Sequence, residues 1–469
     1  MLYDKYDEVS IIHHAKKIEN KSLNLYIMES ESEYMRDSEV ITSLTSYNAG
    51  KGSLGQLVEE VVFGYSINSK QAADFEEVNM ELKVVPLKAV KKSDKNRAKV
   101  HGLSVKERIV LSIIDYHKLN LEEWESNTLN SKLIKLLLMF YLHEKDKEKM
   151  DLVFKLVNKW EPSDAELEVI KNDWLIIRNK VRDGLAHELS EGDTFYLGAC
   201  TKGASSKSVR SQPNSNLPAK QRAFSLKRNF VEDIFSNLLT DTTDKDEKSI
   251  IQVINSVISR YRGISVDKIL LSMSYERSRA KHWLNLMCKK IISNEYSSKL
   301  AENNALKKAG IEMKTILLQP SGIPKEHMSF EQIKYDEIVN EEWETSFVRE
   351  KFENKKHLWI VFQALKPYQK QSELQSSDII LSDVLVWNMP VSDLSNDYRN
   401  LWEDTVEKIQ YGNFQSFIKP NVNRVGHIRP KATNSKDKVE FRGNLVPKKC
   451  FWLNNLYVAS EIVRLKNNS

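Results

Sequence analysis

The pattern of hydrophobic positions predicts alternating helices and strands along much of the chain. Apolar residues at 57, 58, 61 and 62 have the spacing of one face of an amphipathic helix. Residues 109–116 and 135–141 are apolar runs of strand length, although the second could also be helical. We also expect a helix through Trp174, and a polar, helical segment up to about Ser46. With few hairpin-linked strands, this pattern favours an α/β or mixed α+β fold, in which helices flank a mixed central sheet.

One sequence pattern occurs twice. Val-Asn-Met-Glu-Leu-Lys around Glu81 recurs as Ala-Gly-Ile-Glu-Met-Lys around Glu312. Four more matches follow in the same order: Trp124 with Trp343, Trp174 with Trp402, Lys202 with Lys431, and Leu226 with Leu453. The five separations are 231, 219, 228, 229 and 227 residues. Because chance rarely gives one order and nearly one spacing, we expect two tandem domains, residues 1–240 and 250–469, joined by a linker over 241–249.

The first copy contains a candidate metal site. Asp74 precedes Glu81 by seven residues, and Lys83 follows Glu81 by two. On a strand, Glu81 and Lys83 would point to the same face. Two carboxylates can hold Mg²⁺ and leave positions open for water and a phosphate oxygen, with the Lys83 ammonium beside them. The motif is short enough to arise by chance, so a surface strand with mixed charges is the alternative.

The second copy lacks one of these acids. It keeps Glu312 and Lys314, but Ala305 stands seven residues before Glu312. A single carboxylate beside a lysine would bind Mg²⁺ poorly, so we expect the second copy to be catalytically silent.

Composition narrows the class of protein and its location. The net charge of +5 permits nucleic-acid binding, and basic residues concentrate in 88–99 and 202–228. The three cysteines are far apart and form no CxxC, which argues for a reducing compartment and against a disulfide framework or a zinc finger. The chain has no apolar stretch long enough to span a membrane, and its first residues do not resemble a signal peptide. We therefore expect a cytoplasmic protein.

Residues 50–55 match the glycine fingerprint of dinucleotide-binding folds. A buried strand should precede that fingerprint and an acidic ribose-binding residue should follow it, and neither is evident. The segment fits better as a close approach of the backbone to a phosphate at a helix start, which makes Lys51 and Gly52 candidate DNA contacts.

The segment from Gly55 to Lys83 resembles the helix-loop-strand unit of the MutH-type endonucleases. The likeness covers most of both copies and is strongest to the Sau-type GATC restriction enzymes, which carry two MutH-like domains in one chain. It implies a restriction-endonuclease-like fold in each copy. The catalytic residues that it implies are Asp74, Glu81 and Lys83, with Glu59 as the motif glutamate and Lys132 as a further active-site lysine.

The resemblance also implies how DNA is read. The family reads GATC in the major groove through an Arg-Pro-Lys loop, which the second copy keeps and the first replaces by Cys-Thr-Lys. Without the arginine, the first copy must contact bases differently. An aromatic residue thought to sense adenine methylation in the family corresponds to Ser225 and Trp452. The predicted DNA contacts are Lys51, Gly52, Lys202, Lys207, Arg429, Pro430 and Lys431.

The expected function is therefore that of a type II restriction endonuclease. Asp74 and Glu81 would bind Mg²⁺, Glu59 would position a second ion or Lys83, Lys83 would orient the attacking water, and Lys132 would stabilise the scissile phosphate. The expected partners are double-stranded DNA containing GATC, a second copy of the chain on that DNA, and a cognate DNA methyltransferase. The alternatives are a mismatch-repair nicking endonuclease and a non-catalytic GATC-binding regulator.

Overall fold

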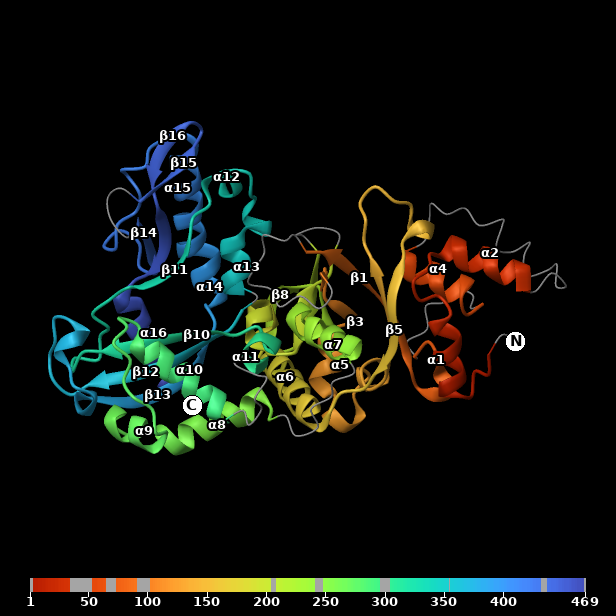
Figure 1. Cartoon of the computed structure of the whole chain (residues 1–469), viewed down its shortest axis with the longest axis horizontal. Coiled ribbons are helices and arrows are strands. Elements are labelled where there is room, and N and C mark those ends of the chain that lie inside the picture. The colour runs from red at the N-terminus through yellow and green to blue at the C-terminus, as the bar shows by residue number, and fades with distance from the viewer. Residues whose placement is uncertain are drawn as a thin grey trace. The chain divides into compact units, whose positions relative to one another are not determined.

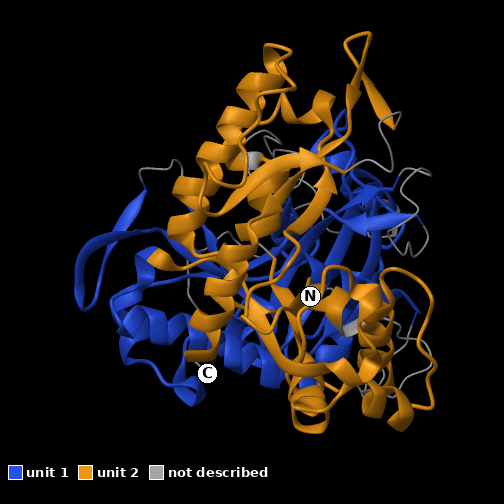
Figure 2. Ribbon diagram, turned by 90° about the vertical axis from the view of Figure 1, so that its left-hand side faces the viewer, with its two compact units in different colours: residues 1–187, 196–246 blue, residues 188–195, 247–469 orange. Residues whose placement is uncertain are grey.

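The computed structural model describes residues 3–33, 53–64, 73–90, 102–203, 208–240, 248–295, 304–353, 355–431 and 437–467. The chain forms two compact units, coloured separately in Figure 2. Unit 1 comprises Met1–His187 and Tyr196–Asp246, and unit 2 comprises Glu188–Phe195 and Glu247–Ser469. Most of the predicted linker, residues 241–247, lies outside the described residues.

The central sheet of unit 1 has the strand order β2-β1-β4-β5. Its strands are β1 (Glu81–Ala89), β2 (Leu103–Val105), β4 (Leu136–Leu142) and β5 (Phe154–Trp160) (Figure 1). β1 pairs with β4 in parallel, and the other neighbours are antiparallel. The run at 135–141 is therefore a strand, and its mostly apolar sequence fits a position between two other strands.

Helices cover both faces of this sheet. α1 (Glu8–Lys16), α2 (Leu23–Glu33) and α4 (Leu54–Val61) share a core cluster with Leu137 and Met139 of β4. On the opposite face, Phe140 contacts Phe235 of α7 (Arg228–Thr240), with 4.9 Å between ring centroids. Because neighbouring residues of a strand point to opposite faces, β4 is buried from both sides.

A smaller second sheet completes unit 1. It has the order β3-β9-β6, formed by β3 (Ile109–Ile113), β6 (Leu197–Thr201) and β9 (Arg222–Leu226). The hairpin of β7 (Val209–Gln212) and β8 (Ser215–Lys220) lies between β6 and β9 in the sequence. The described part of unit 1 also contains the helices α5 (Tyr116–Leu121) and α6 (Asp164–Arg182), and α6 contains Trp174 as predicted.

Unit 2 repeats this plan. Its larger sheet has the order β10-β12-β13, in which β10 pairs with β12 in parallel and β12 with β13 antiparallel, as β1, β4 and β5 do in unit 1. Its second sheet has the order β11-β17-β14, and the hairpin β15-β16 corresponds to β7-β8. The strands are β10 (Glu312–Leu318), β11 (Met328–Gln332), β12 (His357–Ala364), β13 (Ile379–Trp387), β14 (Gly426–Pro430), β15 (Lys438–Phe441), β16 (Asn444–Pro447) and β17 (Lys449–Leu453).

Details of packing also recur. The ring centroids of Trp124 and Trp174 lie 5.7 Å apart in unit 1, and those of Trp343 and Trp402 lie 5.6 Å apart in unit 2. Trp124 is half-buried, whereas the other three are buried.

The helices in the described part of unit 2 are α8 (Ile250–Tyr261), α9 (Val266–Ser272), α10 (Trp283–Glu295), α11 (Asn304–Lys308), α12 (Tyr335–Ile338), α13 (Phe347–Glu353), α14 (Val391–Asp393), α15 (Arg399–Gln410) and α16 (Asn455–Asn467). Among the described residues, no helix has both the length and the apolar character needed to cross a membrane.

The segment Glu188–Phe195 belongs to unit 2, although both of its sequence neighbours belong to unit 1. The Ser190 hydroxyl donates to the Glu353 carbonyl at 2.9 Å, and the Asn388 amide donates to Asp193 at 3.2 Å. Gly192 packs so closely that an added Cβ would lie 2.9 Å from the same Glu353 carbonyl oxygen. Local packing as well as polar contacts therefore fixes this segment.

Candidate active site

Glu81 is a buried carboxylate held between two lysines at the start of β1. Its side chain is only 2% exposed. The Lys83 ammonium donates to Oε1 at 2.6 Å, and the Lys132 ammonium lies 3.2 and 3.4 Å from the two oxygens. Lys83 shares a strand face with Glu81, as predicted, whereas Lys132 ends a short 3-10 turn, Asn130–Lys132, just before β4. The parallel pairing of β1 with β4 brings the second lysine to the site.

A tight turn brings Asp74 back to the same strand. Phe75 and Met80 exchange two backbone hydrogen bonds of 2.9 and 3.1 Å, and Asn79 closes the turn with a φ of 50°. This left-handed conformation suits asparagine better than most residues. The Asp74 carboxylate then accepts a 2.8 Å hydrogen bond from the backbone N–H of Leu82. The seven-residue spacing from Asp74 to Glu81 is therefore the length of a closed turn.

The pKa values of Glu59, on α4, and of Asp74 depend on the charged groups around Glu81. Burial, followed by the negative charge of Glu81, raises the pKa of Asp74. Burial, followed by the charge of Asp74, raises the pKa of Glu59. Lys83 and Lys132 act on both carboxyls in the opposite direction. The structure thus places all five predicted catalytic residues in one electrostatically connected cluster.

The cluster offers suitable ligands for a divalent cation. Its three carboxylates exceed its two ammonium groups by one negative charge, and carboxylate oxygens are the protein ligands that Mg²⁺ prefers. Among the described residues, no group of three or more His, Cys, Asp and Glu side chains is arranged so that it could hold a metal ion. Mg²⁺ usually keeps several water molecules and is bound in proteins through one or two carboxylates.

The corresponding place in unit 2 has a different charge balance. Glu312 begins β10, and each of its oxygens lies 2.6 Å from a lysine, Oε1 from Lys314 and Oε2 from Lys351. Burial raises the pKa of Glu312, but the two lysines outweigh it and bring the pKa to about 2. At the offset of 231 residues that relates β1 to β10, Glu59 corresponds to Lys290, an exposed residue of α10. Of the three carboxylates of the unit 1 cluster, unit 2 therefore keeps only Glu312, which is paired with both lysines.

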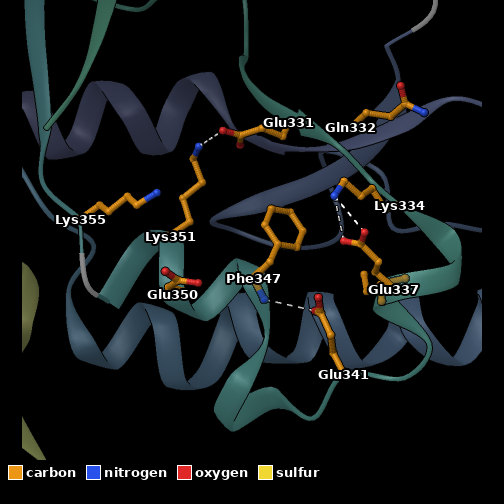
Figure 3. A pocket seen from close by; sticks show the side chains of 10 residues that line it. Glu331, Gln332, Lys334, Glu337, Glu341, Phe347, Glu350, Lys351 and Lys355 are labelled. Carbon is orange, nitrogen blue, oxygen red and sulfur yellow. Dashed lines mark hydrogen bonds and ion pairs between the residues drawn. The ribbon is translucent and has the colours of Figure 1, made fainter. Parts of the chain in front are cut away.

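Lys351 is a residue that the sequence analysis missed. It lies eight residues after Trp343, as Lys132 lies eight residues after Trp124, and this shared spacing could have identified it. Figure 3 shows it reaching Glu331 across a hollow of about 260 Å³ in unit 2. The wall of this hollow also carries the ion pair of Lys334 with Glu337 and a hydrogen bond from the Phe347 backbone to Glu341 (Figure 3).

Four of the predicted DNA contacts, Lys202, Arg429, Pro430 and Lys431, lie at or just beyond the ends of β6 and β14 in the second sheets. Arg429 and Pro430 end β14 and are exposed, and the Arg429 guanidinium stacks 5.3 Å from the ring centroid of Trp452. The Lys431 ammonium donates to the carbonyl of Phe330, and Lys202 is exposed after β6. Lys51, Gly52 and Lys207 lie outside the described residues.

Comparison with known proteins gives matches in both units. Residues 63–173 and 294–400 match the family described as DNA mismatch repair enzyme MutH. The type II restriction enzyme Sau3AI of Staphylococcus aureus is 29% identical over 87% of this chain and 88% of its own length. The DNA mismatch repair proteins MutH of Actinobacillus pleuropneumoniae and Shewanella woodyi are 24% and 28% identical, over 42% and 43% of this chain and 81% and 83% of their own lengths. The predicted family resemblance and the tandem MutH-like fold are confirmed.

Proposed function

We propose that this chain, a MutH-like type II restriction endonuclease, makes Mg²⁺-dependent double-strand cuts in DNA at GATC. The observation that carries the proposal is the cluster in unit 1, where Asp74, Glu59 and Glu81 meet Lys83 and Lys132. A carboxylate group next to ammonium groups suits hydrolysis of a phosphodiester, in which negative charge develops on the phosphate. The GATC target is the one implied by the resemblance to the Sau-type enzymes.

Each residue of the unit 1 cluster would have its own role in phosphodiester hydrolysis. Asp74 and Glu81 would hold Mg²⁺, which supplies a water of lowered pKa and neutralises charge on the phosphate. Lys83, fixed on the same face of β1 as Glu81, would orient the attacking water. Lys132 comes from the other side of Glu81, where its ammonium would stabilise the scissile phosphate. Glu59 would position a second ion or Lys83.

Unit 2 would bind DNA without cutting it and act as an effector. The lone Glu312 is paired through both oxygens, which leaves no carboxylate pair for a metal ion. The exposed Arg429 can address guanine in the major groove through two hydrogen bonds. Since each chain would have one cutting centre, a double-strand break would need two chains or two successive nicks. A cytoplasmic location and a cognate DNA methyltransferase complete the proposal.

A matched pair of variants tests the assignment. On a plasmid with GATC sites, we expect Asp74→Ala to reduce Mg²⁺-dependent cleavage by at least about 10²-fold, the scale of losing one electrostatic contribution to the transition state. Glu312→Ala, which removes the corresponding group of β10, should leave the cutting centre intact. The measurement is the initial rate of conversion of supercoiled plasmid, with EDTA as the blank. Undiminished cleavage by Asp74→Ala would refute the proposal.

The second candidate is a GATC nicking endonuclease of the mismatch-repair type. It is favoured by the MutH relatives and by the single acidic cluster of this kind among the residues that the structure describes. The same plasmid assay separates the two, since a nicking enzyme would accumulate open circles and no linear DNA. A purely regulatory GATC-binding protein would produce neither.

A further inference from the structure

A wide groove in unit 2 lies beside β10. Its volume is about 1220 Å³, and its walls come from the loop 277–282 and the start of α10, from β10 residues 313–317, from residues 324–329 at the start of β11, and from the loop 368–372. All of these segments belong to unit 2. The groove is lined by Lys314, the counterpart of Lys83, whose ammonium is paired with Glu312.

The lining of the groove is strongly basic. Its cationic side chains are Arg277, Arg279, Lys281, Lys314, Lys325 and Lys370, its histidines are His282 and His327, and its single acid is Glu326. Among the residues described, Lys314 alone of the six cations is in an ion pair with a carboxylate. The others are available to an external anion. A row of cations along a groove is the electrostatic pattern that follows a nucleic-acid backbone.

Some of these groups are already fixed in place. The Arg277 guanidinium stacks 4.2 Å from the ring centroid of Trp283 and donates to the carbonyl of Leu374 at 3.1 Å. The Lys325 ammonium donates to the Gln369 side chain, which is neutral, so its charge is not cancelled. Lys325 and Lys370 are exposed, and the bond from Lys325 to Gln369 joins the two segments that carry them. One stretch of a phosphate backbone could therefore contact both.

The balance of charge along the groove decides whether a phosphate needs a metal ion to approach. In unit 1, Asp74 and Glu59 add negative charge that the two lysines do not cancel, so a phosphate is repelled until a cation enters. The groove of unit 2 is lined by six cationic side chains and one carboxylate, Glu326, and one of the six, Lys314, is paired with Glu312 outside the lining. A phosphate therefore meets an excess of positive charge there.

We propose that this groove binds the sugar–phosphate backbone of duplex DNA without a divalent metal ion, with Lys325 and Lys370 as phosphate contacts. The inference rests on the proposed function of unit 2 as a DNA-binding copy. It extends that function, because the sequence placed DNA contacts of unit 2 only at Arg429, Pro430 and Lys431. The groove would supply affinity, whereas the Arg429 loop would read the bases.

The test measures binding of the whole chain to a short GATC duplex in EDTA over a range of salt concentrations. The logarithm of the binding constant falls with the logarithm of salt by about 0.9 per phosphate contact. Lys325→Ala combined with Lys370→Ala should therefore reduce the slope by about 1.8 and weaken binding about tenfold or more. The matched control combines Arg260→Ala with Lys268→Ala, which removes two exposed cations of α8 and α9 that do not line the groove. This control should keep the wild-type slope.

Four results would overturn the inference. The first is that the wild-type chain does not bind the duplex in EDTA but binds it in Ca²⁺. The second and third are that the groove variant keeps the wild-type salt slope, or that the control variant loses as much binding as the groove variant. The fourth is that duplex RNA competes for the chain as well as duplex DNA does. Cleavage with Mg²⁺, measured in parallel, separates this inference from the proposed function. An enzyme that cuts GATC plasmids while the groove variant binds normally would reject only the groove. A wild-type chain that cuts nothing would reject the endonuclease itself.

Discussion

Asp74 and Glu59 are half-buried carboxyls whose pKa values are raised, first by burial and then by the charge of Glu81 for Asp74 and by the charge of Asp74 for Glu59. A carboxyl whose pKa is higher in the folded than in the unfolded chain holds its proton more tightly when folded. Its effect on stability is therefore favourable at low pH and is lost as pH rises from the ordinary value through the folded one. At neutral pH the ionised pair destabilises unit 1, and a bound cation would remove that penalty.

Replacing Asp74 by Asn tests this. The amide can still accept the hydrogen bond from Leu82, but it carries no charge. We expect Asp74→Asn to raise the melting temperature at pH 7 without metal, to have little effect near pH 4, and to reduce the stabilisation that Mg²⁺ gives the wild type. Thermal unfolding at several pH values, with and without Mg²⁺, is the measurement. A variant less stable than wild type at pH 7 would contradict this account.

Part of the site could be predicted from the sequence and part could not. Glu81 and Lys83 follow from strand alternation, which needs only neighbouring residues. The approach of Lys132 to Glu81 depends on which strand pairs with β1, and on its direction, over a separation of 51 residues. A local pattern contains no such information. Lys132 was therefore identified only by family resemblance, and its counterpart Lys351 was missed.

At the scale of elements, a glycine fixes the hairpin β7-β8 against the end of α6. Gly184 has a φ of +72°, and an added Cβ would lie 2.5 Å from the Asn214 carbonyl oxygen at the hairpin turn. The Asn214 side chain donates to the carbonyl of Arg182 at 2.8 Å, and Gln212 accepts from the backbone N–H of Ala186 at 2.7 Å. The hairpin is thus held by backbone contact that leaves no space for a side chain.

We expect Gly184→Ala to cost roughly 2–4 kcal/mol, which combines the left-handed backbone with a steric clash. Gly64→Ala is the matched control, because Gly64 has a φ of +69° but no atom within 4 Å of an added Cβ. It should cost only about 1 kcal/mol. Urea unfolding of both variants measures the difference in free energy. Equal losses would show that the contact with Asn214 is unimportant.

The predicted elements differ from the observed ones where side-chain chemistry interrupts a hydrophobic run. Residues 109–116 had the pattern of one strand, but β3 ends at Ile113. Asp115 then accepts hydrogen bonds from the backbone N–H groups of His117 and Lys118 and begins α5. The predicted helix at 57–63 starts earlier, because Ser53 and Gln56 form a capping box. Hydrophobic spacing located these elements, and capping residues set their ends.

At the scale of the whole molecule, the two units keep one fold and differ in charge. The order β1-β4-β5 of unit 1 recurs as β10-β12-β13 in unit 2, and the match to the MutH family includes residues of both units. The exposed arginine of the Arg-Pro-Lys loop, Arg429, is found in unit 2, whereas Cys200 stands at its place in unit 1. Cutting and recognition are therefore expected to be unequally divided between the units.

Arg429→Ala should consequently weaken DNA binding or activation while leaving the metal site whole. We expect slower cleavage of a two-site plasmid, by the roughly 1–3 kcal/mol that a bidentate arginine–guanine contact contributes. The comparison is with a one-site plasmid, on which an effector unit has no second target on the same molecule. Unchanged cleavage of both plasmids would exclude the effector role.

The short segment Glu188–Phe195 limits how the duplicated chain can be divided. Since this piece of unit 2 is encoded between two stretches of unit 1, no single break in the chain separates the units intact. A fragment that begins at residue 247 would leave Asn388 without its acceptor on Asp193 and the Glu353 carbonyl without the Ser190 hydroxyl. Unit 2 can therefore not be cut from the chain at one point without the loss of a part of its own structure.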